Sequence, residues 1–543
     1  MATPFRALLL AGVCIWLSGC AVGPDYELPA VAVPEVFGTA SLTPAVASAS
    51  SSQSTATADF VRWWQVLHDP RLNALIERAV AANPDIEIML TRVQEARERE
   101  IVVLGAMLPT AGGSAAIATG TGVNHMIGRI PLPLISAANF RGLKSVSRLA
   151  GFDAGWELDL FGKYQRALEA AHDDAEAQME LRNEVLITVI ADVARNYFAI
   201  RGLQSRLEIA RKHVATAQKT VDLLETRSDR GTRSDRETRS DRETRSDRGT
   251  RSDSGTRSGS GRSNELDLTL AKRQLASRQA RLPELAALIS SAESRLAVLL
   301  GTYSADIAAA MQRQAKMPTL PERLRPGVAV DLLRRRPDIR AAERELAAAT
   351  ARIGVATASL FPSVALTAGF GAQGGTQEGP LAPIHNPIWS FGPGAYWPLL
   401  DFGRLDALIN IEEMRAHEAF VRYKKTIIAA VEEVDQAIKQ YRLDRQRLKA
   451  LGEALEESHR AVDLATERYK RGATDFLNVL DAQRQDFALA EEKSVAAQVA
   501  RQSYVAFYKA LGGGWELYDE LPPIPAAQPA VIATVRRLTN GWH

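Results

Sequence analysis

An unbroken apolar spacing constrains this chain more than any other feature of its sequence. Between Arg404 and Lys470 an apolar side chain recurs every seven residues, and no proline interrupts the segment. The residues of this ladder are Phe420, Ile427, Val434, Tyr441, Leu448, Leu455, Val462 and Tyr469. Such a spacing predicts a long helix packed along other helices with coiled-coil geometry. At about 1.5 Å per residue, this helix would be roughly 100 Å long.

The same arrangement occurs in both halves of the chain. Pro84 and Pro337 each open the tripeptide Pro-Asp-Ile, and each is followed 25 residues later by another proline, Pro109 or Pro362. Further along, the halves align at an offset of 241 residues, and the ladder then falls on seven more apolar residues. They are Met179, Leu186, Val193, Ile200, Leu207, Val214 and Val221. This agreement predicts an internal duplication.

Each repeat is predicted to contain a helix, two strands, a long helix, a turn and a medium helix. The first repeat covers 61–301, with strands in 108–161 and the later helices in 163–226 and 264–301. The second covers 336–515, with strands in 360–402 and the later helices in 404–470 and 474–511. A linker, 302–335, and a tail, 516–543, complete the chain. Because each strand pair goes out and back, the two shorter helices of a repeat should stack end to end beside the long helix.

The predicted strands alternate in the way that membrane strands do. In the second strand, Phe152, Ala154, Trp156 and Leu158 alternate with small or charged residues. Segments of about ten alternating residues with aromatic side chains are typical of transmembrane β-barrels, although the strands of a soluble sandwich alternate too. Four strands cannot close a membrane barrel, because even the smallest use about eight. The edges of this sheet should therefore pair with other copies of the chain.

The N-terminus resembles the signal of a bacterial lipoprotein. The apolar run after Arg6 is too short to span a bilayer, which needs about 20 residues. The Leu-Ser-Gly before Cys20 resembles the lipobox, in which the cysteine is acylated and becomes the first mature residue. Ala21 is not the aspartate of an inner-membrane retention signal, so the resemblance implies the outer membrane. We expect a signal peptide at 1–19 and a lipidated, extended tether at 20–60; an ordinary signal peptide is the alternative.

A charged array lies at the end of the first long helix. Thr226 to Gly261 consists of six hexapeptides, each with arginine at its second position. Across it the offset between the halves drops from 241 to 211, and the 30 missing residues equal five hexapeptides. The array (226–261) is therefore interpreted as an in-frame expansion of one turn. We expect a solvated protrusion, largely disordered or weakly helical, whose deletion from Thr232 to Gly261 leaves assembly intact.

Composition and motifs exclude most other functions. The formal net charge of +2 gives no nucleic-acid signal, and the array lacks the aromatic residues of RNA-binding segments. The only cysteines are Cys14 and Cys20, so no disulfide framework or thiolate metal site is expected. Gly369, Gly371 and Gly374 match a dinucleotide-binding spacing, but no helix follows them. The eight histidines lack metal-binding spacing, and no nucleophile elbow or phosphate-binding loop occurs. No enzyme activity, metal or cofactor is expected beyond the covalent lipid.

The order of elements and several motifs resemble those of the TolC-like outer-membrane factors. The motifs are Trp63-Trp64, Trp156-Glu157-Leu158-Asp159-Leu160-Phe161-Gly162, Arg335-Arg336-Pro337-Asp338-Ile339-Arg340-Ala341-Ala342-Glu343 and Leu480-Asp481-Ala482-Gln483-Arg484. The resemblance extends from Trp63 to Trp515, and the lipobox places the chain with the NodT-type lipoproteins of multidrug efflux systems. It implies an α+β membrane protein of Gram-negative bacteria that works as a homotrimer. A twelve-stranded outer-membrane β-barrel, four strands per protomer, would continue into an α-helical coiled-coil barrel through the periplasm.

The same resemblance implies partners and a gate. A periplasmic adaptor protein and an inner-membrane pump of the RND type would dock at the far end of the helical tunnel. Leu477 and Asp481 match positions that ring the constriction there, and Asp267, beside the array, is a further candidate. An apolar ring bars hydrated solutes and a carboxylate ring selects cations, although Asp481 would also fit a plain solvated position at a helix start.

The expected function is a passive exit duct for drugs or other small molecules. A duct for type I protein secretion and a structural lipoprotein that spans the periplasm are the alternatives.

Overall fold

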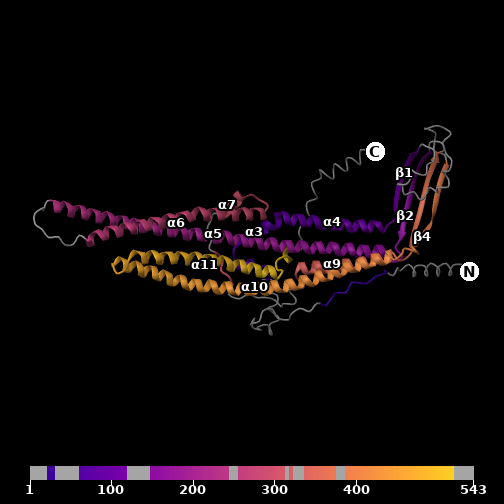
Figure 1. Cartoon of the computed structure of the whole chain (residues 1–543). Helices are drawn as coiled ribbons and strands as arrows, with labels where there is room; N and C mark the ends of the chain where they lie inside the picture. Colours follow the sequence, from indigo (N-terminus) through magenta and orange to yellow (C-terminus); the bar gives the residue numbers. More distant parts are fainter. Residues whose placement is uncertain are drawn as a thin grey trace.

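The molecule is elongated, with a four-stranded sheet at one end and long helices running away from it (Figure 1). The computed structural model describes residues 21–30, 60–118, 147–243, 255–311, 317–321, 335–374 and 386–518. The predicted signal peptide, the predicted acylation site Cys20 and the tail from residue 519 onwards lie outside the described residues.

Six helices form the body of the molecule. They are α4 (Pro84–Ala106), α5 (Lys163–Glu243), α6 (Gly255–Leu299), α9 (Pro337–Ala358), α10 (Arg404–Lys470) and α11 (Phe476–Ala510). α4 and α6 follow one another along α5, and α9 and α11 follow one another along α10 (Figure 1). The expected end-to-end stacking beside each long helix is thus confirmed. We call α5 with α6 the first hairpin and α10 with α11 the second hairpin.

The seven-residue ladder of α10 forms its packed face. All eight ladder residues are buried or half-buried in the described chain, and Ile427, Val434 and Tyr441 are the most deeply buried of them. No single helix of the described residues is long and apolar enough to cross a membrane, although α6 from Glu265 onwards and α7 (Ser304–Met311) qualify together as a bent pair. The buried ladder shows that α10 is held by packing along a helical seam, as the spacing predicts.

The sheet joins the two repeats. Its strands are β1 (Thr110–Ala118), β2 (Ser147–Leu158), β3 (Ser363–Gly374) and β4 (Asn386–Tyr396). They are antiparallel and lie in the order β1-β2-β3-β4, so β2 of the first repeat pairs with β3 of the second. The two strands per repeat agree with the prediction. β1 and β4 are left as open edges of the sheet within one chain.

The largest core lies midway along the helices, where both repeats meet. Here α3 (Pro70–Ala82) and α7 pack against the long helices. Trp63 and Trp64 are almost completely buried, and the Trp63 ring stacks on Tyr508 of α11 at a centroid distance of 5.6 Å. Aromatic side chains of this size dominate the stability of a core. This core therefore fixes the first hairpin against the second at mid-height.

The first hairpin is longer than expected at the end away from the sheet. α5 continues to Glu243, beyond the predicted end near residue 226, and α6 begins at Gly255, before the predicted start at 264. The described parts of the array are thus helical, and the first hairpin projects past the end of the second (Figure 1). Arginine and glutamate favour helices, and each array aspartate precedes an arginine by four residues, a spacing that supports a helix.

Candidate functional site

The tip of the second hairpin lies at the end of the molecule opposite the sheet. In the turn after Lys470, Gly472 has a φ of 75°, which favours glycine. Beside this turn, buried apolar side chains of α5, α6 and α11 pack together. They are Val221, Leu224, Ala271, Phe476 and Val479. This cluster joins the two hairpins close to the tip.

Leu477 and Asp481, the predicted constriction residues, lie outside that cluster. Leu477 is 57% exposed, although the residue before it is buried. Asp481, one helical turn later, is also exposed and accepts hydrogen bonds from Arg484 Nη2 and Gln485 Nε2, both at 2.7 Å. The structure thus brings the two residues onto one exposed face of α11 and adds Arg484 as the ion-pair partner of Asp481. Their role in a constriction stays a prediction.

Asp267, the third predicted residue, lies in a different environment. It is half-buried on α6, and burial together with the nearby carboxylate of Asp475 raises its pKa. At the offset of 211 residues it corresponds to Asn478, whereas the counterpart of Leu477 is Leu266. Leu266 is also 57% exposed. The sequence prediction missed Leu266, although the repeat offset was sufficient to find it.

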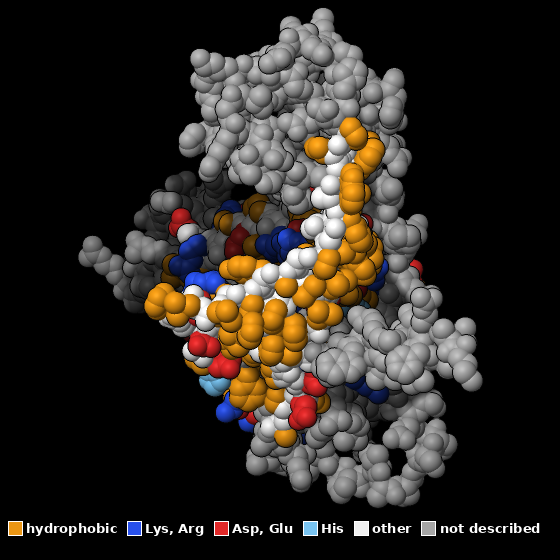
Figure 2. Space-filling view, turned by 90° about the vertical axis from the view of Figure 1, so that its right-hand side faces the viewer, with side chains coloured by type: hydrophobic (Ala, Val, Ile, Leu, Met, Phe, Trp, Pro, Cys, Tyr) orange, Lys and Arg blue, Asp and Glu red, His pale blue; other side chains and the backbone are white. Residues whose placement is uncertain are grey.

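One face of the sheet carries exposed aromatic side chains. Phe152, Phe370 and Trp389 face one another across three strands, because each is the direct register partner of the next. These three and Phe391 are all more than half exposed, and Figure 2 shows hydrophobic side chains spread over this end of the molecule. An apolar surface of this kind marks a contact with a membrane or another protein.

Further exposed apolar side chains lie on two helices at opposite sides of the chain. On α4 they are Ile88, Ile101, Val102 and Leu104. On α10 they include Leu408, Ile411, Met414, Val421 and Ile428. α4 and α10 lie on opposite sides of the chain in Figure 1. One chain therefore presents an apolar surface on each flank, below the two open sheet edges.

Residues 21–30 form a strap across the helices near the sheet. Val22 N donates to Phe161 O at 3.2 Å, and Arg166 on α5 binds both Val22 O and Asp25. Gly23 has a φ of 98° and lies against Gly354 of α9, where an added Cβ would be 2.4 Å from Gly354 Cα. Because the strap runs up to Ala21, the residue after Cys20 lies at the junction of the sheet and the helices.

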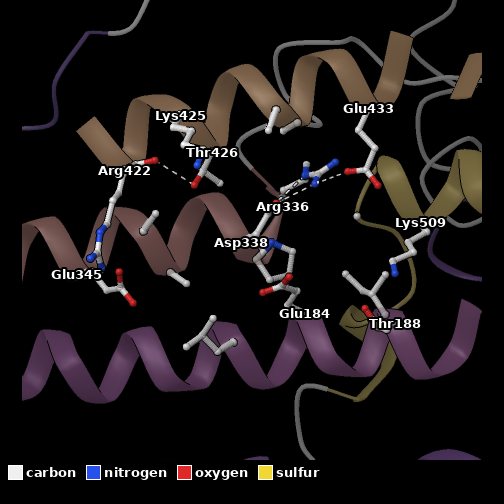
Figure 3. Close-up of a pocket in the computed structure, with 18 residues that line it drawn as sticks. Glu184, Thr188, Arg336, Asp338, Glu345, Arg422, Lys425, Thr426, Glu433 and Lys509 are labelled. Atoms are coloured by element: carbon white, nitrogen blue, oxygen red, sulfur yellow. Dashed lines mark hydrogen bonds and ion pairs between the residues drawn. The ribbon is translucent and has the colours of Figure 1, made fainter. Parts of the chain in front are cut away.

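A pocket of about 630 Å³ lies between α5, α9, α10 and α11 (Figure 3). Its acidic side chains are Glu184, Asp338, Glu345 and Glu433, and its basic side chains are Arg336, Arg422, Lys425 and Lys509. The buried Arg336 at the start of α9 binds Asp338, Glu433 (2.8 Å) and the Ala510 carbonyl. Because Arg336 joins α9, α10 and α11, we interpret this pocket as a structural junction.

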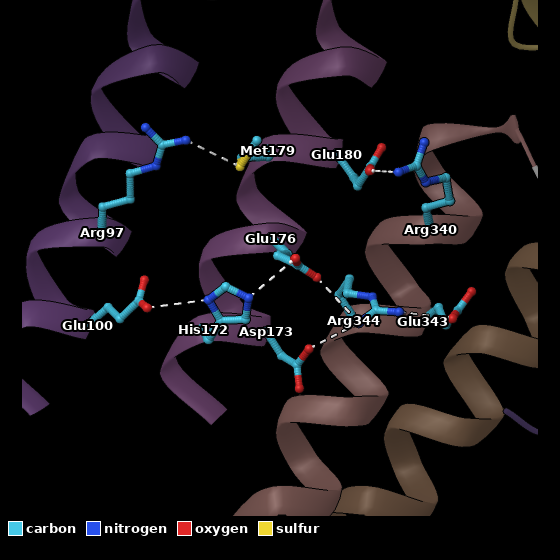
Figure 4. Close-up of polar contacts among 10 residues, drawn as sticks. All are labelled: Arg97, Glu100, His172, Asp173, Glu176, Met179, Glu180, Arg340, Glu343 and Arg344. Atoms are coloured by element: carbon cyan, nitrogen blue, oxygen red, sulfur yellow. Dashed lines mark hydrogen bonds and ion pairs between the residues drawn. The ribbon is translucent and has the colours of Figure 1, made fainter. Parts of the chain in front are cut away.

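Ion pairs brace the helices nearer the sheet (Figure 4). His172 of α5 lies 3.3 Å from both Glu100 of α4 and Glu176 of its own helix. Arg344 of α9 contacts Asp173 at 3.2 Å and Glu176 at 3.3 Å. These contacts link α4, α5 and α9. Among the described residues, no group of three His, Cys, Asp or Glu side chains is placed to hold a metal ion.

Comparison with known proteins places these features in one family. Residues 75–244 and 328–513 match the family described as outer membrane efflux protein. Nodulation protein T of Rhizobium leguminosarum bv. trifolii is 27% identical over 94% of this chain and 97% of its own length. The solvent efflux pump outer membrane protein SrpC of Pseudomonas putida is 29% identical over 95% of this chain and 98% of its own. The solved outer-membrane channel OprN superposes with a TM-score of 0.72 at 30% identity, covering 92% of this chain and 100% of its own.

Proposed function

Because this chain belongs to the outer membrane efflux protein family, we propose that it is a passive exit duct for small molecules in a tripartite efflux system. It is an outer-membrane channel protein of a Gram-negative bacterium, and its family consists of channel proteins. In this proposal it carries solutes without catalysing a reaction. The observation that carries the proposal is an exposed aromatic sheet face at the end of a helical body roughly 100 Å long.

The proposed working form is a homotrimer. Edge strands β1 and β4 each have an unpaired side in one chain, and the apolar flanks on α4 and α10 continue below them. A head-to-tail contact between two different flanks closes into a ring when the rotation fits. Three copies would supply twelve strands, which is enough for a membrane barrel with an open lumen. The aromatic face would then point to lipid.

The proposed gate is the tip of the second hairpin. Three copies of Leu477, with Leu266 from the first hairpin, would narrow the lumen with apolar side chains. Three copies of Asp481 would form a carboxylate ring that favours cations and repels itself. Arg484 offsets part of that repulsion, since it binds Asp481 within each chain.

The proposed partners follow from this orientation. The acylated Cys20 would lie in the outer membrane, since the strap brings Ala21 to the base of the sheet. The tip would then point into the periplasm, toward an adaptor protein and an inner-membrane pump of the RND type. SrpC is named as part of a solvent efflux pump, which supports small organic molecules as the cargo. The projecting first hairpin would be the first part of the duct that an adaptor meets.

Reconstitution of the acylated protein in planar bilayers tests the proposal. We expect discrete conductance steps from material that chemical cross-linking shows to be trimeric. In a strain that lacks the gene, we expect increased sensitivity to organic solvents or drugs, restored by the wild-type gene. Trimers that never conduct would refute the duct and leave the structural lipoprotein as the function.

A further inference from the structure

Four polar side chains meet between the two hairpins, a short distance above the tip. His213 comes from α5, Arg278 from α6, His459 from α10 and Asp486 from α11. Asp486 is the eleventh residue of α11, which places it about 15 Å from the start of that helix. Each of the four helices at this level thus contributes one member. We call these residues the four-helix cluster.

The two charged members of the cluster are buried, whereas His459 lies at its edge with a side chain that is 60% exposed. Arg278 and Asp486 are only 7% and 6% exposed. His459 Nδ1 lies 2.7 Å from Asp486 Oδ1, within the second hairpin. Arg278 Nη1 lies 3.5 Å from His213 Nδ1, within the first hairpin. Buried charges of this kind are stable only while they are balanced by partners.

At the level of the four-helix cluster, Arg278 and Phe487 form the contacts between the hairpins. Arg278 Nη2 donates to the Gln483 carbonyl of α11 at 3.4 Å, and its guanidinium lies over the Phe487 ring at 5.3 Å. The His213 ring meets the same Phe487 ring edge to face at 4.8 Å. A cation over an aromatic ring and an edge-to-face aromatic pair each stabilise the contact between the two side chains. At this level the first hairpin therefore contacts α11 through Arg278 and His213.

The charge balance across this contact depends on the two histidines. With both neutral, the first hairpin contributes the cation Arg278 and the second contributes the anion Asp486, so the two sides attract. Protonation of His459 cancels the charge of Asp486 within the second hairpin. Protonation of His213 adds a second cation beside Arg278. An attraction between unlike charges is thereby replaced by a cationic side facing a neutral one.

The surroundings of His213 favour its neutral form. Burial and the neighbouring Arg278 lower the pKa of His213, with His459 acting in the same direction and Asp486 against it. These are the charged and titratable groups that face it from α6, α10 and α11. A histidine whose pKa is lowered in the packed arrangement opposes that arrangement once it is protonated. The packed contact therefore has its full stability above the ordinary histidine range and loses it as the pH falls below that range.

We propose that the four-helix cluster is a proton-sensitive coupling that holds the second hairpin against the first and releases it in acid. This proposal depends on the proposed function for one point only: that the end of the molecule opposite the sheet is the end that opens. Its residues are positioning residues, because none of them lines the suggested constriction at Leu477 and Asp481. Separation of the hairpins itself is a change within one chain and can be measured without any transport.

Hydrogen exchange on the acylated, full-length protein tests the coupling. The amides of residues 476–490 are followed at pH 7.5 and pH 5.5, with rates corrected for the intrinsic effect of pH. In the wild type we expect protection of this segment to fall several-fold at the lower pH. The double variant His213→Gln, His459→Gln should keep its protection, because neither glutamine gains a proton. Loss of protection in that variant equal to the wild type would overturn the proposal.

Two further variants control the experiment. His172→Gln removes another histidine of α5, one that contacts Glu100 and Glu176 far from the tip, and it should retain the full response to pH. Asp486→Asn removes the anion, so we expect weak protection at both pH values. If the double histidine variant does not fold, Asp486→Asn tests the coupling in its place. Strong, pH-dependent protection of residues 476–490 in Asp486→Asn would refute the coupling. Bilayer recordings provide the separate test: protein that never conducts refutes the duct and leaves the exchange result valid.

Discussion

Replacing Glu491 by glutamine removes the charge from a second link between the hairpins. Glu491 of α11 accepts from Arg206 of α5 at 2.6 Å and from Arg281 of α6 at 2.8 Å, through one carboxylate oxygen. Its side chain is 22% exposed, and those of Arg206 and Arg281 are 15% and 34% exposed. We call this contact of Glu491 with Arg206 and Arg281 the clamp. It is shielded from solvent more than an ordinary ion pair on the surface.

The magnitude follows from this partial burial. Hydrogen bonds to charged groups contribute about 1.5–3 kcal/mol when buried, and exposed ion pairs about 0–1 kcal/mol. Arg281 keeps a second partner, Glu284 at 2.6 Å, so Arg206 loses most in the variant. We expect Glu491→Gln to lower the free energy of local opening of α11 by about 2 kcal/mol per chain.

Native-state hydrogen exchange of α11 measures this quantity directly. The matched control is Glu492→Gln, the next residue on the same helix. Its partner Arg447 lies at 2.8 Å, but both side chains are about half exposed, so we expect a loss below about 0.5 kcal/mol. Equal effects of the two substitutions, or no effect of Glu491→Gln, would refute the assignment of Glu491 as a clamp.

The clamp and the four-helix cluster respond to different ranges of pH. Burial opposes ionisation of Glu491, but hydrogen bonds from Arg281 and Arg206 outweigh it and lower the pKa of this carboxyl. A carboxylate with a lowered pKa stabilises the packed form above its ordinary pKa, and that stability is lost as the pH falls through the lowered value. Glu491 therefore stays ionised at pH 5.5 and does not contribute to the response that we expect there from the four-helix cluster.

Three other predictions concern the gate, the array and the membrane face. Asp481→Ala should raise the resting conductance in planar bilayers, because it removes a ring of carboxylates from the proposed constriction; an unchanged closed pore would contradict the gating role. Deletion of Thr232–Gly261 should leave the trimer intact in cross-linking and gel filtration, because it restores the length of the other repeat; loss of folded trimer would show that the array is structural. Phe370→Arg should destabilise the membrane-inserted form by about 2–4 kcal/mol if the aromatic face meets lipid, measured by urea unfolding in vesicles. Ser390→Arg, on the opposite face of the sheet, should cost much less, and equal costs would contradict the assignment of the faces.

Local patterns determined most of the fold. The seven-residue ladder predicted α10 at 404–470, and the structure has the same bounds, because a coiled-coil seam needs an apolar residue at every repeat. The offset of 241 predicted a matching long helix in the first repeat for the same reason, and the segment after Pro109 or Pro362 predicted a strand pair in each repeat. The alternation along β3 predicted the sheet face on which Phe370 lies, but neither its pairing with Phe152 and Trp389 nor the order β1-β2-β3-β4 followed from it.

Only the tertiary structure decided which residues hold the hairpins together. Arg484 lies three residues from Asp481 and was within reach of sequence reasoning, but His213, Arg278 and Asp486 come from three separate helices. No periodicity in the sequence relates the positions of these residues, because a polar contact between packed helices depends on how far the helices are shifted along one another. For the array, composition left a disordered and a weakly helical protrusion as alternatives, and in its described residues the structure has helix up to Glu243 and again from Gly255. The sequence by itself determined a pair of long, duplicated hairpins joined to membrane strands; the packing of those hairpins decided where a proton or a single carboxylate can control them.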